Sequence, residues 1–208
     1  IIKKRSYSSD VSRETIKDLE DYSKSIIIKN KDINLISAST EKTINTRHIE
    51  DSAQTIDFID KKDINICTDL GSGAGLPGIV LAILMKHKNP LFKVIFYEKS
   101  FHKSNFLKEM TKKFALNTEI HQENIFKEQN LKTDVIISRA FKPLPTILEI
   151  ASTNFKNFKY IILYLGKSGK KILETAMKNW KFEYEEKKSL TNEESLIVKI
   201  SNLQKKNV

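Results

Sequence analysis

The sequence lacks several features that would indicate a membrane or secreted protein. It contains one cysteine, Cys67, in 208 residues, so no disulfide can form within the chain and a reducing, cytoplasmic location is expected. No apolar run approaches the roughly 18 residues that a membrane-spanning helix needs. No basic segment followed by an apolar stretch and a small-residue cleavage site opens the sequence, so no secretory signal is expected.

The chain also lacks the side-chain spacing of a metal site. Its four histidines, His48, His87, His102 and His121, do not show the separations of metal ligands. Cys67 lies in an apolar run, as a buried core cysteine does. We therefore expect neither a metal nor a nucleophilic cysteine.

Positive charge is what the chain has in excess. It carries 36 basic and 26 acidic residues, a net charge of +10. One explanation is a polyanionic partner such as RNA or DNA, and the other is a general richness in lysine, because net charge alone does not decide between them. The length suits one domain with its own core, and the hydrophobic content of 39% is that of an ordinary globular protein.

The periodicity of the apolar residues predicts two helices, over residues 9–30 and 41–59, before any strong strand. Strands and helices then alternate, which indicates βαβ units and an α/β fold with a mostly parallel sheet. The predicted strands lie at residues 64–70, 92–97, 118–121, 133–138, 160–165, 182–187 and 195–200, the last two as an antiparallel pair. Helices are expected at 76–86, 101–114, after Pro145 and at 170–178.

These elements predict three parts of the chain. Residues 1–60 form an N-terminal helical extension packed on the core, 61–203 form the main domain, and 204–208 form a loose tail.

A glycine-rich turn joins the first strand to the next helix, with the pattern Asp69-x-Gly71-x-Gly73-x-Gly75. A turn this tight needs residues without a Cβ atom. The helix that follows points free N–H groups and its positive dipole end at whatever lies above the loop. Ligands of open parallel sheets bind at the carboxyl ends of the strands, so a cofactor is expected here.

Two cofactors remain possible on spacing alone. Gly73-x-Gly75-x-x-Gly78 also fits a dinucleotide pattern and an NAD-dependent oxidoreductase. Asp69 favours S-adenosylmethionine, because a carboxylate repels a pyrophosphate and attracts a sulfonium and an amino group. Glu98 ends the next strand, where a carboxylate can accept the ribose hydroxyls of either cofactor.

Ordered motifs narrow this interpretation to one family. They are Asn34-Leu-Ile followed by Arg47-His48-Ile-Glu-Asp51-Ser52, the loop Asp69-Leu-Gly-Ser-Gly-Ala-Gly-Leu-Pro-Gly-Ile79, Glu98-Lys-Ser-x-x-Lys103-x-x-Phe106-Leu107, and Val135-Ile-Ile-Ser138-Arg139-Ala140-Phe141. Over residues 29–165 the chain resembles the bacterial small-subunit ribosomal RNA methyltransferase G family, which methylates N7 of a guanine.

The resemblance implies a class I S-adenosylmethionine-dependent methyltransferase fold, Rossmann-like, with a seven-stranded, mostly parallel sheet, an antiparallel last strand and N-terminal helices. The implied substrate is guanine 527 in the 530 loop of 16S rRNA, as rRNA or as a 30S particle, and a monomer is expected. Guanine N7 has a lone pair and no proton to lose, so in-line attack on the methyl group needs no general base. A noncatalytic RNA-binding assembly factor on the same fold is the alternative.

Residue roles follow from the loop and from the resemblance. Arg139 and His48 are expected to position the reacting groups. Arg47 and Asp51 have the i, i+4 spacing of a helix ion pair, and by resemblance their helix is expected to line the active-site pocket. Basic side chains near the strand ends are expected to contact RNA, and these are Arg47, Lys103, Lys142 and Lys167. The cofactor is expected to contact Asp69, Gly71, Gly73, Gly75, Leu76, Glu98, Glu123, Asn124 and Arg139.

Overall fold

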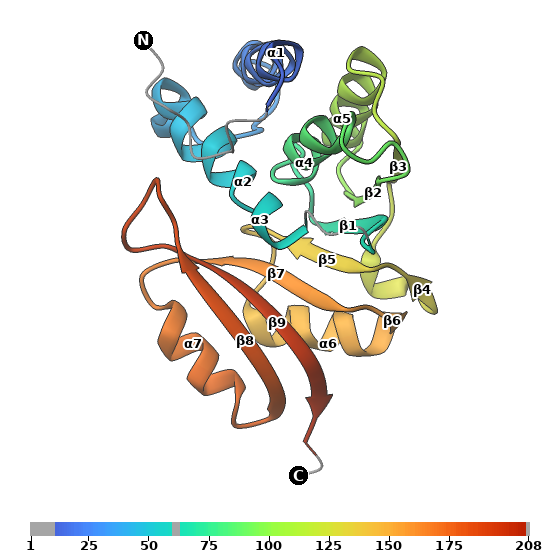
Figure 1. Ribbon diagram of the computed structural model, residues 1–208, viewed down its shortest axis with the longest axis vertical. Helices are drawn as coiled ribbons and strands as arrows, with labels where there is room; N and C mark the ends of the chain where they lie inside the picture. The colour runs from blue at the N-terminus through green and yellow to red at the C-terminus, as the bar shows by residue number, and fades with distance from the viewer. Residues whose placement is uncertain (1–10, 60–62, 207–208) are drawn as a thin grey trace.

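A seven-stranded sheet forms the centre of the protein, in the order β3-β2-β1-β5-β7-β9-β8 (Figure 1). The computed structural model describes residues 11–59 and 63–206. The strands are β1 (Ile66–Leu70), β2 (Lys93–Tyr97), β3 (Thr118–His121), β5 (Val135–Ser138), β7 (Tyr160–Leu165), β8 (Trp180–Lys188) and β9 (Leu196–Lys205). β9 is antiparallel to both of its neighbours, whereas the pairs from β3 to β7 are parallel. The predicted α/β class and the antiparallel last strand are therefore confirmed.

Helices cover both faces of this sheet. Figure 1 shows α1 (Arg13–Asn30), α4 (Gly78–Met85) and α5 (Phe101–Lys113) on one side, with α6 (Leu144–Asn154) and α7 (Gly169–Ala176) on the other. Neighbouring residues of β5 pack into the cores on opposite faces of the sheet. Ile137 packs with the first group of helices and Ile136 with the second. Because successive side chains of a strand point to opposite faces, a strand buried on both sides is a continuous apolar run.

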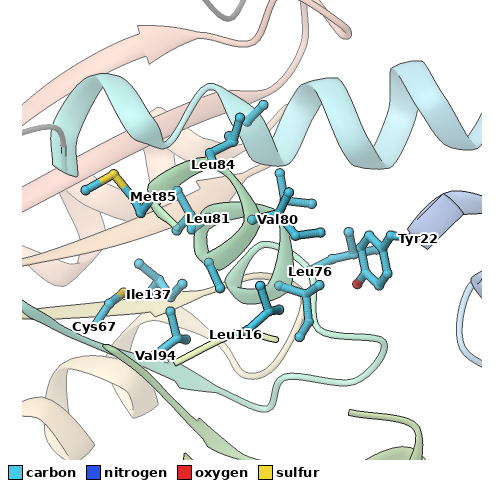
Figure 2. Close-up of a cluster of buried hydrophobic side chains, with 14 of the residues drawn as sticks. Tyr22, Cys67, Leu76, Val80, Leu81, Leu84, Met85, Val94, Leu116 and Ile137 are labelled. Atoms are coloured by element: carbon cyan, nitrogen blue, oxygen red, sulfur yellow. The ribbon is translucent and has the colours of Figure 1, made fainter. Parts of the chain in front are cut away.

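The helix after the glycine-rich turn, α4, is buried over its whole length. It packs against the sheet on one side and against α1 and α2 (Asp51–Ala53) on the other, which explains why its sequence is apolar all round. Figure 2 shows its Val80 and Leu84 between these layers, with Tyr22 of α1 beside Leu76. Cys67 of β1 is fully buried in the same cluster, as predicted, and burial raises the pKa of its thiol.

The segment predicted as one helix over residues 41–59 is broken into short pieces, so that prediction was wrong in detail. A 3₁₀ turn leads into a π-helical turn, and two short α-helical pieces follow. These are η1 (Ala38–Thr43), η2 (Asn45–Glu50), α2 (Asp51–Ala53) and α3 (Ile56–Ile59). A π turn is wider than an α turn and changes the direction of the side chains that follow it. Here Ile49 enters the core while His48 lines a cavity described below.

Other element boundaries differ by small amounts. α1 begins at Arg13, where the Ser12 hydroxyl accepts a hydrogen bond from the Thr15 amide, and the expected start at residues 9–10 lies outside the described residues. α6 begins at Leu144, with Pro145 in its first turn, where a missing N–H costs little. Short elements that were not predicted are η3 (Ile125–Lys127), β4 (Leu131–Lys132) and β6 (Phe155–Asn157).

The C-terminal strand is longer than the sequence indicated. β9 continues to Lys205, whose ammonium bonds the Glu149 carboxylate of α6 at 2.9 Å. Residues 204–205, expected in a loose tail, are therefore part of the sheet, and residues 207–208 lie outside the described residues. Within the described ranges, none of the helices combines the length and apolar character needed to cross a bilayer.

Candidate active site

The glycine-rich turn leaves β1 at the carboxyl edge of the sheet, level with the end of β2, because Leu70 is paired with Tyr97. Its three alternate glycines, Gly71, Gly73 and Gly75, all have positive φ, at 67°, 56° and 90°. The space around them differs. A Cβ atom on Gly75 would lie 2.4 Å from Ile79 Cγ1, whereas the nearest atom to a Cβ on Gly73 is 3.9 Å away. Gly75 is thus fixed by packing, and Gly73 borders open space.

The turn is braced from two directions. On one side Glu98, at the end of β2, accepts a hydrogen bond from the Gly73 amide at 2.8 Å through Oε2 and one from the Ser100 amide at 2.8 Å through Oε1. On the other side the buried Tyr22 hydroxyl of α1 donates to the Ala74 carbonyl at 2.7 Å. The N-terminal helix therefore supports the loop directly.

A cavity of about 710 Å³ opens above this turn, between the ends of β1, β2 and β5 and the segment at residues 35–37. Several residues predicted from the sequence line it, namely His48, Gly71, Gly73, Leu76, Glu98, Lys103, Glu123, Asn124, Arg139 and Lys142. Four predicted residues are not on its wall: Arg47, Asp69, Gly75 and Lys167. Its lining also includes Lys99 and residues that were not predicted, among them Ser37, Tyr97, Phe126 and Phe141.

Asp69 lies beneath the turn and is fully buried. Its Oδ2 accepts a hydrogen bond from the Gly78 amide at 2.9 Å, at the start of α4, and its Oδ1 has no hydrogen-bond partner among the described residues. Burial raises the pKa of Asp69 to about 7, against the lowering effect of the Gly78 bond and with a smaller raising effect from the Glu98 charge. The sequence predicted that Asp69 contacts the cofactor. In the structure its carboxylate lies beneath the turn and bonds the start of α4.

The raised pKa of Asp69 predicts a pH effect on stability. Between its ordinary pKa of 3.8 and about 7, the folded protein holds a proton that the unfolded chain has lost. This proton raises the free energy of unfolding by up to about 4 kcal/mol below about pH 4, and the contribution is lost as the pH rises through about 7. Asp69→Asn cannot ionise, so we expect it to remove this loss. Denaturant unfolding of both proteins at several pH values measures the difference, and parallel pH curves would contradict it.

Arg139 follows β5 directly and is held at the cavity wall by the segment that contains η2 and α2. Its Nη2 donates to the Arg47 carbonyl at 2.7 Å and lies 3.2 Å from Oδ2 of Asp51. Its Nη1 donates to the Ser52 hydroxyl at 3.3 Å, and the guanidinium carbon is 5.4 Å from the centre of the Tyr164 ring. A guanidinium has five N–H donors, and these contacts use only some of them.

Asp51 therefore pairs with Arg139, and the i, i+4 ion pair with Arg47 that the spacing allowed is not found among the described residues. The π-helical geometry of η2 is the reason, because four residues no longer complete one turn there. Arg47 supplies its backbone carbonyl to the site, and its side chain does not line the cavity.

His48 lines the cavity in an uncharged form. Burial, with a contribution from the nearby Arg139 charge, lowers the pKa of His48 to about 4. Its Nε2 bonds the Thr40 hydroxyl at 2.8 Å, and its buried Nδ1 has no hydrogen-bond partner in the described part of the chain. A neutral imidazole fits the predicted positioning role and does not supply a positive charge.

The lysines near the site fall into two groups. Lys99, Lys103 and Lys142 line the cavity and form no ion pair with a carboxylate of residues 11–59 or 63–206. Lys167, which is also expected to contact RNA, lies outside the cavity and pairs with Glu194 at 2.8 Å.

The sequence placed Asp51 on a helix expected, by resemblance, to line the active-site pocket, but it did not identify Phe141 or Tyr164 as parts of the site. Phe141 packs over the turn, because a Cβ on Gly71 would lie 2.1 Å from its ring. The Ser-Arg-Ala-Phe motif already contained this residue, and the sequence offered no signal for Tyr164.

The comparisons with known proteins agree with this geometry. A family model for "rRNA small subunit methyltransferase G" matches residues 15–198. This chain belongs to that family. It is 45% identical over 202 residues to ribosomal RNA small subunit methyltransferase G of Pelagibacter ubique, covering 96% of this chain and 94% of that protein. The same-named protein of Rickettsia akari is 36% identical over 196 residues, covering 94% and 98%.

Among solved structures, M. jannaschii TYW2 in complex with AdoMet matches with a TM-score of 0.53 at 16% identity, over 76% of each chain. Such a likeness shows the fold, and the class I methyltransferase architecture that the resemblance implied is thereby confirmed.

As a member of this methyltransferase family the protein uses S-adenosylmethionine, which decides between the two cofactors that the glycine spacing left open. The residues present fit it. Any side chain at Gly73 would project into the open cavity, so the backbone here can approach a ligand closely. Each oxygen of Glu98 accepts one backbone bond and keeps a second lone pair, which suits the two hydroxyls of a ribose.

Proposed function

We propose that the protein transfers the methyl group of S-adenosylmethionine to N7 of a guanine in the 530 loop of 16S rRNA, at guanine 527 by resemblance. The observation that carries the proposal is the fixed guanidinium of Arg139 at the wall of the cofactor cavity, in a chain of the small-subunit rRNA methyltransferase G family. Guanine offers two acceptors side by side, O6 and N7. An arginine that donates to O6 leaves N7 free to react.

The side chains around the cavity suit a reaction without a general base. N7 attacks with a lone pair and loses no proton, so the protein contributes alignment and electrostatics. His48 is neutral, and both His48 and Arg139 are held by hydrogen bonds at the wall. S-adenosylmethionine supplies the methyl group and an in-line leaving sulfur when it is bound. Gly71, Gly73 and Leu76 would lie beneath it.

The remaining cofactor contacts are assigned to the edges of the cavity. Glu98 would accept the ribose hydroxyls, and Glu123 and Asn124, which line the cavity before η3, would lie beside the adenine. One chain supplies this whole cavity, so we propose that a monomer is active.

RNA is proposed to approach over the rim lysines, which we define as Lys99, Lys103 and Lys142. Exposed lysines elsewhere are often neutralised, for example Lys170 by Glu186 at 3.0 Å and Lys205 by Glu149 at 2.9 Å. Unpaired ammonium groups around an active-site mouth are available to phosphates. Each phosphate contact releases counterions from the RNA and so makes binding more dependent on salt.

We expect the double variant Lys103→Ala with Lys142→Ala to bind rRNA more weakly. The slope of log K against log salt should fall by roughly 1 to 2 in magnitude, because two phosphate contacts are lost. Filter binding at several salt concentrations measures this slope. Lys170→Ala with Lys205→Ala removes the same charge from paired sites and serves as the control. Equal slopes for the two double variants would contradict the proposed RNA path.

The decisive experiment is methyl transfer with mapping of the product. Labelled S-adenosylmethionine is incubated with unmodified 30S particles and, separately, with naked 16S rRNA, and N7-methylguanine is located by strand cleavage at the modified base. One methyl group at guanine 527 is expected. RNA binding without transfer would indicate a noncatalytic assembly factor, and methylation at another base or atom would refute the proposed specificity.

A further inference from the structure

Asp51 is a buried carboxylate that joins three separate parts of the chain. Its Oδ2 lies 3.2 Å from Nη2 of Arg139, at the end of β5. Its Oδ1 accepts hydrogen bonds from the Ser189 hydroxyl at 2.7 Å and the Thr191 hydroxyl at 3.0 Å, both on the loop between β8 and β9. The Gln54 side-chain amide, three residues further along the chain, donates another hydrogen bond to Oδ1 at 3.3 Å. With 7% of its surface exposed, Asp51 is held on every side by polar partners.

Such a carboxylate is costly to bury and needs a specific reason to be there. The desolvation of a buried ion pair commonly cancels much of its attraction, so the pair is weak as a source of stability. Asp51 also lies outside the set of residues that line the cavity. Its effect on the reaction would have to pass through Arg139.

The orientation of Arg139 depends on few other contacts. Besides Asp51, the guanidinium donates to the Arg47 carbonyl and to the Ser52 hydroxyl, and it rests near the Tyr164 ring. Only Asp51 balances its charge among the described residues. Asp51 is the one anion among these contacts, and opposite charges attract more strongly where water is largely excluded, so this ion pair favours the orientation in which the other N–H groups face the cavity.

We propose that Asp51 is a positioning residue for methyl transfer: it orients Arg139 toward the reacting guanine, and the β8–β9 loop holds Asp51 through Ser189 and Thr191. The inference rests on the proposed function, because it requires that Arg139 acts on the reacting groups. It assigns to that loop, which is distant from the glycine-rich turn in sequence, a defined part in the geometry of the site.

A double-mutant cycle tests this role. Asp51→Asn, Arg139→Gln and the double variant are compared in the labelled methyl-transfer assay. A misplaced catalytic group can cost about 100-fold, so Asp51→Asn is expected to lower kcat at least about 10-fold in the wild-type background. In the Arg139→Gln background the same change should cost less than about 2-fold, because no guanidinium remains to be oriented. A residue that only supports the fold would lower kcat by the same factor in both backgrounds.

Thermal unfolding supplies a second readout. Arg139→Gln leaves the Asp51 charge buried without its cation, so adding Asp51→Asn should raise the melting temperature above that of Arg139→Gln alone. Asp57→Asn is the matched control, since Asp57 is an aspartate of α3 that pairs with Lys187 away from the cavity. It should leave kcat unchanged in either background.

Ser189→Ala with Thr191→Val gives a test that keeps the Asp51 charge and covers the case in which Asp51→Asn does not fold. Loss of two hydrogen bonds to a carboxylate is expected to lower kcat roughly 3- to 10-fold, again only when Arg139 is present. Equal losses in both backgrounds, or no loss in any variant, would overturn the inference. Failure of the wild type to form N7-methylguanine would instead overturn the proposed function.

Discussion

Replacing Arg139 by alanine is expected to lower kcat for methyl transfer by about 100-fold, the usual effect of removing one preorganised donor from an active site. The Arg139 side chain is 18% exposed, and Arg47, Asp51 and Ser52 hold its guanidinium on one side. This leaves donors free to face the cavity. Labelled methyl transfer to unmodified rRNA gives kcat, and calorimetry gives the affinity for S-adenosylmethionine.

The fold should survive this change, because Asp51 keeps its bonds from Ser189 and Thr191. Circular dichroism and thermal unfolding check that point. Arg139→Lys keeps the charge but cannot reproduce the planar, multiply bonded guanidinium, so it should also be strongly impaired. Arg13→Ala removes an exposed arginine of α1 as a control. Near-normal activity of Arg139→Ala in a folded protein would show that Arg139 is not part of the chemistry.

Gly73→Ala is expected to weaken cofactor binding and Gly75→Ala to lower stability, although both glycines lie in the same turn. At Gly73 the new methyl group meets no protein atom closer than 3.9 Å and enters the cavity. The positive φ of 56° costs an alanine roughly 1–2 kcal/mol, so the protein should stay folded. Overpacking against the bound cofactor should weaken S-adenosylmethionine binding about 10- to 100-fold.

At Gly75 the new methyl group meets Ile79 at 2.4 Å and Leu107 at 2.8 Å, with φ at 90°. The expected result is a loss of stability of about 1–3 kcal/mol or more, with weaker cofactor binding only as a consequence. Calorimetry with S-adenosylmethionine and denaturant unfolding on both variants separate the two effects. If Gly73→Ala bound the cofactor normally, the cofactor would not lie against this part of the turn.

Local chemistry explains why much of the fold was predictable. Strands buried on both faces read as apolar runs, so β1, β2, β5 and β7 were visible in the sequence, and α4 was visible as an apolar helix after a glycine-rich turn. Gly71 and Gly73 line the cavity because positive φ and close approach require glycine, a property of the residue itself.

Two charged side chains show that the partner of a charge is chosen by the fold. The i, i+4 spacing offered Arg47 as a partner for Asp51, and Asp51 pairs with Arg139. Lys167, which is expected to contact RNA, pairs with Glu194 in the folded chain. Local spacing predicted neither outcome, because the helix periodicity changed at η2 and the β8–β9 loop folded back onto the site.

The sequence by itself determined the α/β architecture, the position of the cofactor turn and the family, since these depend on apolar periodicity and on residues such as Gly73 that act through their own backbone. Only the tertiary structure decided that Asp69 is buried beneath the turn and that Asp51 orients toward Arg139. The physical reason is that burial and ion pairing are properties of an environment, and the residues that form this environment lie far apart in the chain, 87 positions in the case of Ser52 and Arg139.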